Sequence, residues 1–109
     1  MKNIKMKIAI KKRDKKIDLK VEKANKLKGL MFRRNNQAIL FEFNKPTRQA
    51  IHSFFCKPFL AVWLDKDEEI LETKIIKTWK FSIKPRKKFS KLIEIPLSNY
   101  KIVNFIVDK

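Results

Sequence analysis

The stretch IKMKIAIKKRDKKIDLKV, residues 4–21, indicates how the domain begins. Apolar residues occupy every second position on either side of a polar run: Ile4, Met6, Ile8, Ile10, Ile17, Leu19 and Val21. A period of two is typical of a β-strand with one buried face. The polar run Lys12–Lys16 between the two halves predicts a turn. The stretch therefore predicts a β-hairpin at the start of a β-rich domain.

Further short runs rich in β-branched or aromatic residues also predict strands. These runs are Ile39–Phe43, Ala50–Cys56, Phe59–Asp65, Glu69–Lys77, Lys91–Ile95 and Ile102–Val107. The prolines lie between the runs or at their ends, where a missing N–H does not interrupt a ladder. The pattern predicts a mainly β fold of about eight short strands, an antiparallel, jelly-roll-like sandwich or barrel.

One short helix is expected after the hairpin, near residues 22–28. Ala24, Leu27 and Met31 fall three and four residues apart there, which is the spacing of an apolar stripe on a helix. Gly29 is the only glycine of the chain and follows this segment directly. Glycine takes the left-handed conformation that ends many helices without a steric penalty. We therefore expect the helix to end at Gly29.

The length and composition fit one domain, residues 1–109, with 44% apolar residues to build its core. Cys56 is the only cysteine, so no disulfide can form within the chain and a cytoplasmic location is expected. No apolar run approaches the roughly 20 residues of a membrane span, so no membrane association is expected.

The chain is strongly basic, with a net charge of +17 from 28 lysines and arginines against 11 acidic residues. The positive electrostatic field of such a chain attracts phosphate backbones, anionic surfaces or acidic proteins. A lysine-rich surface is equally typical of an AT-rich genome or of a thermophile, with no dedicated partner. Lysines along strands also discourage edge-to-edge pairing, so we expect a monomer.

Five segments occur in an order that resembles a known family. They are GLMFR at 29–33, AILFEF at 38–43, HSFFCKPFLAVWLDKD at 52–67, IKTW at 76–79 and LIEIP at 92–96. The chain resembles the domain-of-unknown-function family 192, also called uncharacterised protein family 0127, over about residues 20–98. The resemblance implies a small β-sandwich or barrel and no particular activity.

The chain also departs from the family pattern at positions that matter for chemistry. Leu60 stands where the family has an aspartate, and Glu68 stands where it has a turn glycine. Thr78 replaces the proline before Trp79. Arg33 is the polar residue that the chain keeps from the motif G-L-M-x-R. The resemblance therefore implies the fold, and Arg33 is the first position to consider for a site.

The sequence predicts no catalytic residue, metal site or cofactor. His52 and Cys56 would share one face of a strand about 13 Å apart, beyond the reach of a hydrogen-bonded dyad. One histidine and one cysteine also fall short of a zinc ligand set. No phosphate loop or dinucleotide motif is present. Binding is therefore favoured over catalysis.

Two binding hypotheses remain open. The first is a non-enzymatic domain whose cleft receives a small ligand or a protein partner near four residues: Arg33, His52, Trp79 and Glu94. The second is a nucleic-acid-binding protein that uses the run KIIKTWKFSIKPRKKFSK, residues 74–91, in which aromatic rings and cations alternate.

The second hypothesis suits single strands or RNA, because rings stack on bases while lysines neutralise phosphates. Its predicted contact residues are Lys77, Trp79, Lys80, Arg86, Lys87 and Lys88. In the alternative interpretation of the same run, Trp79, Phe81 and Phe89 pack in the core while the lysines are solvated. A dedicated site would gather the cations on one surface.

Overall fold

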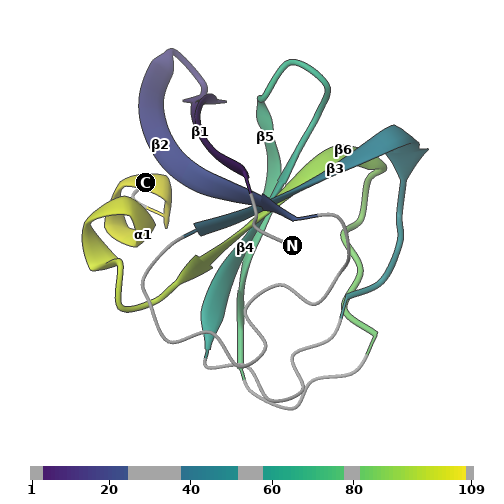
Figure 1. Ribbon diagram of the computed structural model, residues 1–109. Helices are drawn as coiled ribbons and strands as arrows, with labels where there is room; N and C mark the ends of the chain where they lie inside the picture. The colour runs from purple at the N-terminus through teal and green to yellow at the C-terminus, as the bar shows by residue number, and fades with distance from the viewer. Residues whose placement is uncertain (1–3, 25–37, 52–57, 78–81, 108–109) are drawn as a thin grey trace.

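One curled sheet and one short helix make up the part of the chain described by a computed structural model, residues 4–24, 38–51, 58–77 and 82–107 (Figure 1). The elements are β1 (Ile4–Lys12), β2 (Lys15–Ala24), β3 (Ala38–Thr47), β4 (Phe59–Leu64), β5 (Ile70–Ile76), β6 (Phe89–Pro96) and α1 (Tyr100–Val107). The predicted mainly β fold is confirmed.

The hairpin of β1 and β2 forms as the alternating pattern predicted. The two strands are antiparallel, with Ile8 opposite Leu19 and Ile10 opposite Ile17. Pairing continues as far as Lys12 and Lys15, so the turn is tighter than the predicted five-residue run. The alternation places one side of the hairpin towards the core.

The strand order in the sheet is β1-β2-β3-β6-β4-β5. All neighbouring strands are antiparallel except β2 and β3, which are parallel with Val21 aligned to Ala38. The expectation of a wholly antiparallel sheet was wrong for this pair. A parallel pair needs a connection of about a dozen residues or more, and residues 25–37 provide that length.

The sheet curls until its two edge strands approach each other at one corner. There the Lys11 N–H donates to the Glu68 carbonyl oxygen at 2.9 Å, and Lys11 forms an isolated parallel bridge with Glu69. α1 packs on the concave side, and the Lys12 Nζ donates to the Ile106 carbonyl oxygen at 2.6 Å. Within the described ranges the fold is a curled half-barrel covered by a helix. Of the predicted sandwich or barrel, the sandwich was wrong.

The C-terminal segment was wrongly predicted as a strand. Residues 102–107 belong to α1, whose first helical hydrogen bond runs from the Val103 N–H to the Asn99 carbonyl oxygen at 3.2 Å. Val103 and Ile106, three residues apart, are both buried against the sheet. Helical spacing buries both side chains together, so tertiary packing overrides the strand preference of β-branched residues.

The prediction of a helix near residues 22–28 was wrong for residues 22–24, which are the part of it that the structure describes. Residues 22–24 continue β2, because Glu22 and Lys23 pair with β1 on one side and β3 on the other. Main-chain pairing with two neighbouring strands outweighs the apolar spacing that suggested a helix. The rest of the predicted helix and its glycine end, Gly29, lie outside the described residues.

The predicted count of about eight strands was too high for the described part of the chain, whose sheet has six strands. One of the predicted strands is α1. Of the run Ala50–Cys56, Ile51 forms an isolated bridge with Ile83, and residues 52–57 lie outside the described ranges. The remaining six predictions correspond to β1 to β6.

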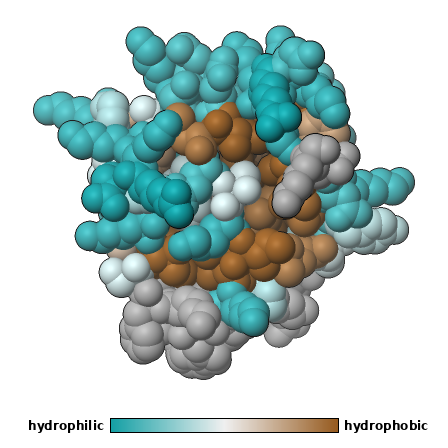
Figure 2. Space-filling view, turned by 180° about the vertical axis from the view of Figure 1, so that it is seen from behind, coloured by the Kyte–Doolittle hydropathy of each residue, from teal (hydrophilic) through white to brown (hydrophobic). Residues whose placement is uncertain are grey.

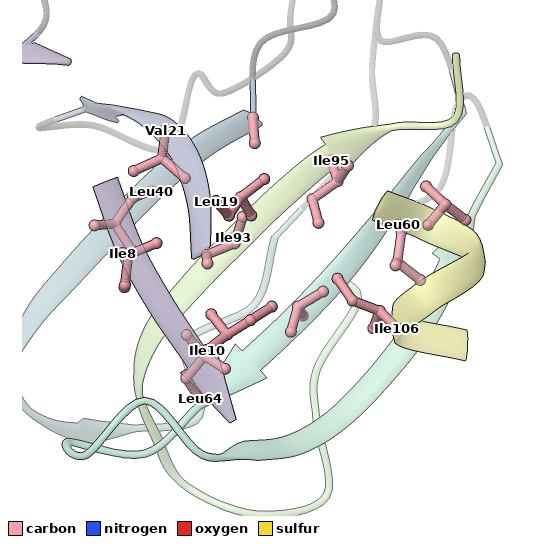
Figure 3. Close-up of a cluster of buried hydrophobic side chains, with 13 residues drawn as sticks. Ile8, Ile10, Leu19, Val21, Leu40, Leu60, Leu64, Ile93, Ile95 and Ile106 are labelled. Atoms are coloured by element: carbon pink, nitrogen blue, oxygen red, sulfur yellow. The ribbon is translucent and has the colours of Figure 1, made fainter. Parts of the chain in front are cut away.

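The concave face of the sheet holds the first of two hydrophobic clusters (Figure 3). Its buried members are Ile8, Ile10, Leu19, Val21, Ala38, Leu40, Leu60, Val62, Leu64, Ile93, Ile95, Val103 and Ile106. Figure 3 shows side chains of the curled strands and of α1 pointing towards one another. The helix thus completes a core that the six strands leave open.

The second cluster lies on the opposite face of β3, β4 and β6, and β5 also contributes to it. Its members are Ile39, Phe41, Ile51, Phe59, Ala61, Trp63, Ile76, Ile83, Phe89 and Leu92. The ring of Phe89 packs edge-on to Phe43 and Trp63, with centroids 5.1 and 6.4 Å apart. Because both faces are covered, every residue of β4 is buried.

Candidate functional site

Glu94 is the one member of the predicted ligand cleft that the structure describes. It lies in β6, only 4% exposed, and aligns with Ile39 of β3 and Ala61 of β4 on the face of the second cluster. Glu22 of β2 also aligns with Ile39 and is also buried. Two buried carboxylates therefore flank Ile39 on one sheet face. Glu22 was not predicted as a site residue, because the apolar spacing around it predicted a helix.

The other three cleft residues, Arg33, His52 and Trp79, lie outside the described residues, as do Cys56 and Lys80. A groove of different composition is present elsewhere on the molecule.

This groove runs along β5, an edge strand of the sheet, and consists of two adjoining hollows of about 570 and 470 Å³. Residues 74–77 and 82–84 line the first hollow. Residues 71–74, Lys84, Arg86 and Lys87 line the second. The hollows share Lys74 and Lys84, so we treat them as one surface, the β5 groove.

The wall opposite β5 is the segment 82–87, which is held in place by hydrogen bonds. Ile51 and Ile83 exchange two backbone hydrogen bonds of 2.9 and 2.8 Å. The Arg48 Nε donates to the Pro85 carbonyl oxygen at 3.0 Å, and the Arg86 N–H donates to the Glu72 Oε1 at 2.8 Å. Buried Ile83 anchors the segment to the second cluster. The groove is therefore a built feature of the fold.

The charge lining the β5 groove is predominantly positive. Five exposed cationic side chains line it: Lys74, Lys77, Lys84, Arg86 and Lys87. Among the described residues that line the groove, Glu72 is the only acidic one, and its carboxylate already accepts the Arg86 N–H. Close lysines and an arginine produce a positive potential that favours an anionic group. The groove can therefore bind carboxylates or phosphates.

Aliphatic surface lies beside these cations. Ile75 is 54% exposed in β5, and Leu71 and Thr73 are half-buried. Seen from the side opposite to Figure 1, the molecule carries hydrophilic side chains along its top and sides and hydrophobic residues over much of its middle (Figure 2). A ligand of the β5 groove would thus meet both charge and apolar surface.

The residues predicted to bind nucleic acid are partly gathered here. Lys77, Arg86 and Lys87 line the β5 groove, whereas Lys88 is exposed and lines neither hollow. Phe89, expected among the stacking rings, is only 1% exposed and belongs to the core. The described residues that line the groove include no aromatic ring.

Lys74 and Lys84 are cations of the basic run but were not among the predicted contact residues. Glu72 was not predicted, because this residue precedes the run and its hydrogen bond to the Arg86 N–H joins segments that are 14 positions apart. The recurrence of cations on both sides of Trp79 was the available signal for Lys74 and Lys84.

A second charged cluster joins neighbouring strands at another position. Glu42 forms ion pairs with Lys23 at 2.8 Å and with Lys91 at 3.8 Å, and Lys91 also pairs with Glu68. These contacts connect β2, β3 and β6 with the turn between β4 and β5, so their role is structural.

Within the described ranges, no cluster of three or more histidine, cysteine, aspartate or glutamate side chains could hold a metal ion. Among the helices described there, none has the length and hydropathy to cross a membrane.

Comparison with solved structures finds the same fold at low sequence identity. The chain superposes on a proposed transcription regulator from Sinorhizobium meliloti with a TM-score of 0.79 and 18% identity, over 95% of this chain and 89% of that one. A protein of unknown function from Novosphingobium aromaticivorans gives a TM-score of 0.72 and 14% identity, over 90% and 79% of the two chains. No protein-family model and no curated protein matches the chain. The likenesses show a shared β fold.

Proposed function

We propose that this chain is a binding domain that receives an acidic protein partner in the β5 groove. The observation that carries the proposal is the lining of the groove, whose described residues include five exposed cations and one acidic residue, with the carboxylate of the latter hydrogen-bonded to the wall. Complementary charge accelerates encounter and selects against cationic partners. Exposed Ile75 adds apolar surface that a protein segment can cover.

A second candidate function is binding of single-stranded nucleic acid. Its support is that Lys77, Arg86 and Lys87, predicted as phosphate contacts, line the same groove. Single-strand binding also draws affinity from base stacking on aromatic rings. Because no aromatic ring lines the groove among the described residues, we place an acidic protein first.

Two further proposals come from the sequence: membership of family 192 and a small-ligand site. The resemblance to family 192 is supported by the backbone of Glu68, which has a φ of 64° where the family has a glycine. A small-ligand site around Arg33, His52, Trp79 and Glu94 stays a prediction. The burial of Glu94 on the sheet face that also holds Glu22 supports a polar site at this position.

The experiment compares two fluorescent polyanions, poly-glutamate and a single-stranded oligonucleotide of about 12 residues, by anisotropy across a salt series. We expect poly-glutamate to bind at low salt and affinity to fall as salt rises, because the contacts are between exposed charges. The double variant Lys74→Gln, Lys84→Gln should lower its affinity by about 2- to 20-fold, the effect of losing two exposed ion pairs.

The matched control is the double variant Lys15→Gln, Lys101→Gln, which removes the same charge from exposed positions outside the groove. It should change affinity much less than the groove variant. If both double variants lose affinity equally, or neither polyanion binds at low salt, the proposed function is wrong.

A further inference from the structure

The outer edge of β5 offers a main-chain binding surface inside the groove. β5 pairs with β4 on one side and ends the strand order of the sheet on the other. In the described part of the chain, no backbone hydrogen bond joins residues 71–76 to any segment other than β4. Unpaired edges of this kind are templates for an added strand.

The dimensions of this edge match a short strand. Residues 71–76 span about 17 Å at the usual rise of a β-strand. The wall at residues 82–87 is tied to Ile51, Arg48 and Glu72, so it stands beside β5 without pairing to it through the backbone. Among the described residues, this side of the groove is a strand edge without a backbone partner, and an extended segment can lie along it.

We propose that an acidic, extended peptide segment of a partner protein binds by adding as a strand to the outer edge of β5. This inference rests on the proposed function and specifies the mode of binding. Main-chain hydrogen bonds to residues 71–76 would supply affinity, and the cations Lys74, Lys84 and Arg86 would select carboxylates.

The alternation of side chains along β5 determines which residue types the bound segment needs at each position. Glu72 and Lys74 align with Trp63 and Ala61 and so share the face of the second cluster, whereas Thr73 and Ile75 lie on the opposite face. Cross-strand neighbours lie on the same face of a sheet. The segment therefore places acidic residues beside Lys74 and aliphatic residues beside Ile75, an alternation of period two.

Charge excludes a second copy of this chain as the occupant. Two β5 edges would bring Lys74 and Lys77 of each copy together, and each chain carries a net charge of +17. Like charges on adjacent strands are destabilising. The same lysines that prevent self-pairing attract a segment of opposite charge.

The test uses a peptide of about 8 residues that alternates glutamate with valine, a length within the range of natural strands. Hydrogen exchange followed by NMR should show slower exchange at amides of residues 71–76 when the peptide binds. Two further peptides carry N-methyl groups on either the odd or the even residues, because successive N–H groups of a strand point to opposite edges.

One methylated peptide should lose about 10- to 100-fold in affinity, since two or three main-chain hydrogen bonds each contribute roughly five-fold. The other should bind as the parent does. Lys74→Gln should weaken the parent peptide by about two- to five-fold, the effect of one exposed ion pair, with Lys101→Gln as the control that leaves it unchanged.

The outcomes separate the two proposals. If the parent peptide binds but both methylated peptides bind equally well and amides 71–76 gain no protection, strand addition is wrong and binding through charge stands. Binding of the oligonucleotide without the peptide overturns strand addition in favour of nucleic acid. If neither probe binds, the proposed function itself fails.

Discussion

Arg13 and Glu68 occupy left-handed backbone conformations, with φ values of 59° and 64°. Arg13 lies in the turn between β1 and β2, and Glu68 in the turn between β4 and β5. This conformation costs a residue with a Cβ roughly 1–2 kcal/mol of steric energy, whereas glycine adopts it without that cost. The chain uses its single glycine at position 29 and tolerates strain at these two turns.

Arg13→Gly should raise the free energy of unfolding by about 0.5 to 1 kcal/mol, since the strain removed exceeds the added entropy of the unfolded chain. Urea denaturation measures the change. The control Arg13→Ala keeps the Cβ and should give no gain. Equal effects of the two substitutions would contradict the strain argument. Glu68 is a less direct test, because it also pairs with Lys91.

Side-chain identity predicted which residues are buried better than it predicted their roles. Alternation correctly placed Ile8, Ile10 and Leu19 on the inner face, because the period of two is a local property of the strand. No local pattern in the sequence indicated the role of Glu72. Its contact with the Arg86 N–H joins residues that are 14 positions apart, and only the folded chain brings them together.

α1 stabilises the half-barrel by covering its concave face. Val103 and Ile106 insert into the first cluster, while Asn104 is exposed on the opposite side of the helix. Figure 1 shows α1 beside β2 of the hairpin. The helix therefore belongs to the core of the fold.

Ile106→Ala should lower the free energy of unfolding by about 2–5 kcal/mol, because it removes buried methyl groups and leaves a cavity. Asn104→Ala is the matched control on the exposed face of α1 and should change stability by less than about 0.5 kcal/mol. Urea denaturation followed by circular dichroism measures both. A loss below about 1 kcal/mol for Ile106→Ala would show that α1 is not part of the cooperative core.

The sequence predicted six strands at nearly their observed positions, but it assigned the wrong element to residues 102–107. Locally, the run IVNFIV has the β-branched composition of a strand. Whether it pairs as a strand or packs as a helix depends on the surface available to it. The curled sheet offers a concave apolar face to Val103 and Ile106, and that surface exists only after the strands assemble.

At the scale of the whole molecule, the net charge of +17 opposes compactness. The hairpin illustrates this repulsion, because three cross-strand pairs place lysine opposite lysine: Lys7 with Lys20, Lys11 with Lys16, and Lys12 with Lys15. Like charges in such pairs are destabilising. The apolar core must therefore offset a repulsion that salt screens.

The melting temperature should rise between about 0.02 and 0.5 M sodium chloride as screening reduces this repulsion. Lys16→Glu, which places a carboxylate opposite Lys11, should raise it by about 1 to 4 °C at low salt and by less at high salt. Differential scanning calorimetry measures both effects. A melting temperature that falls with salt would contradict the expected repulsion. Sedimentation of the same samples tests the predicted monomer.

The sequence by itself determined the approximate positions of six strands, the alternation of faces in the hairpin and the basic run at residues 74–91, because these depend on local spacing and composition. Only the tertiary structure decided the parallel pairing of β2 with β3, the helical state of residues 100–107 and the gathering of Lys74, Lys84 and Arg86 along one open edge. These features depend on which distant segments meet. Main-chain pairing and the burial of apolar surface choose among such arrangements, and neither is fixed by the local pattern.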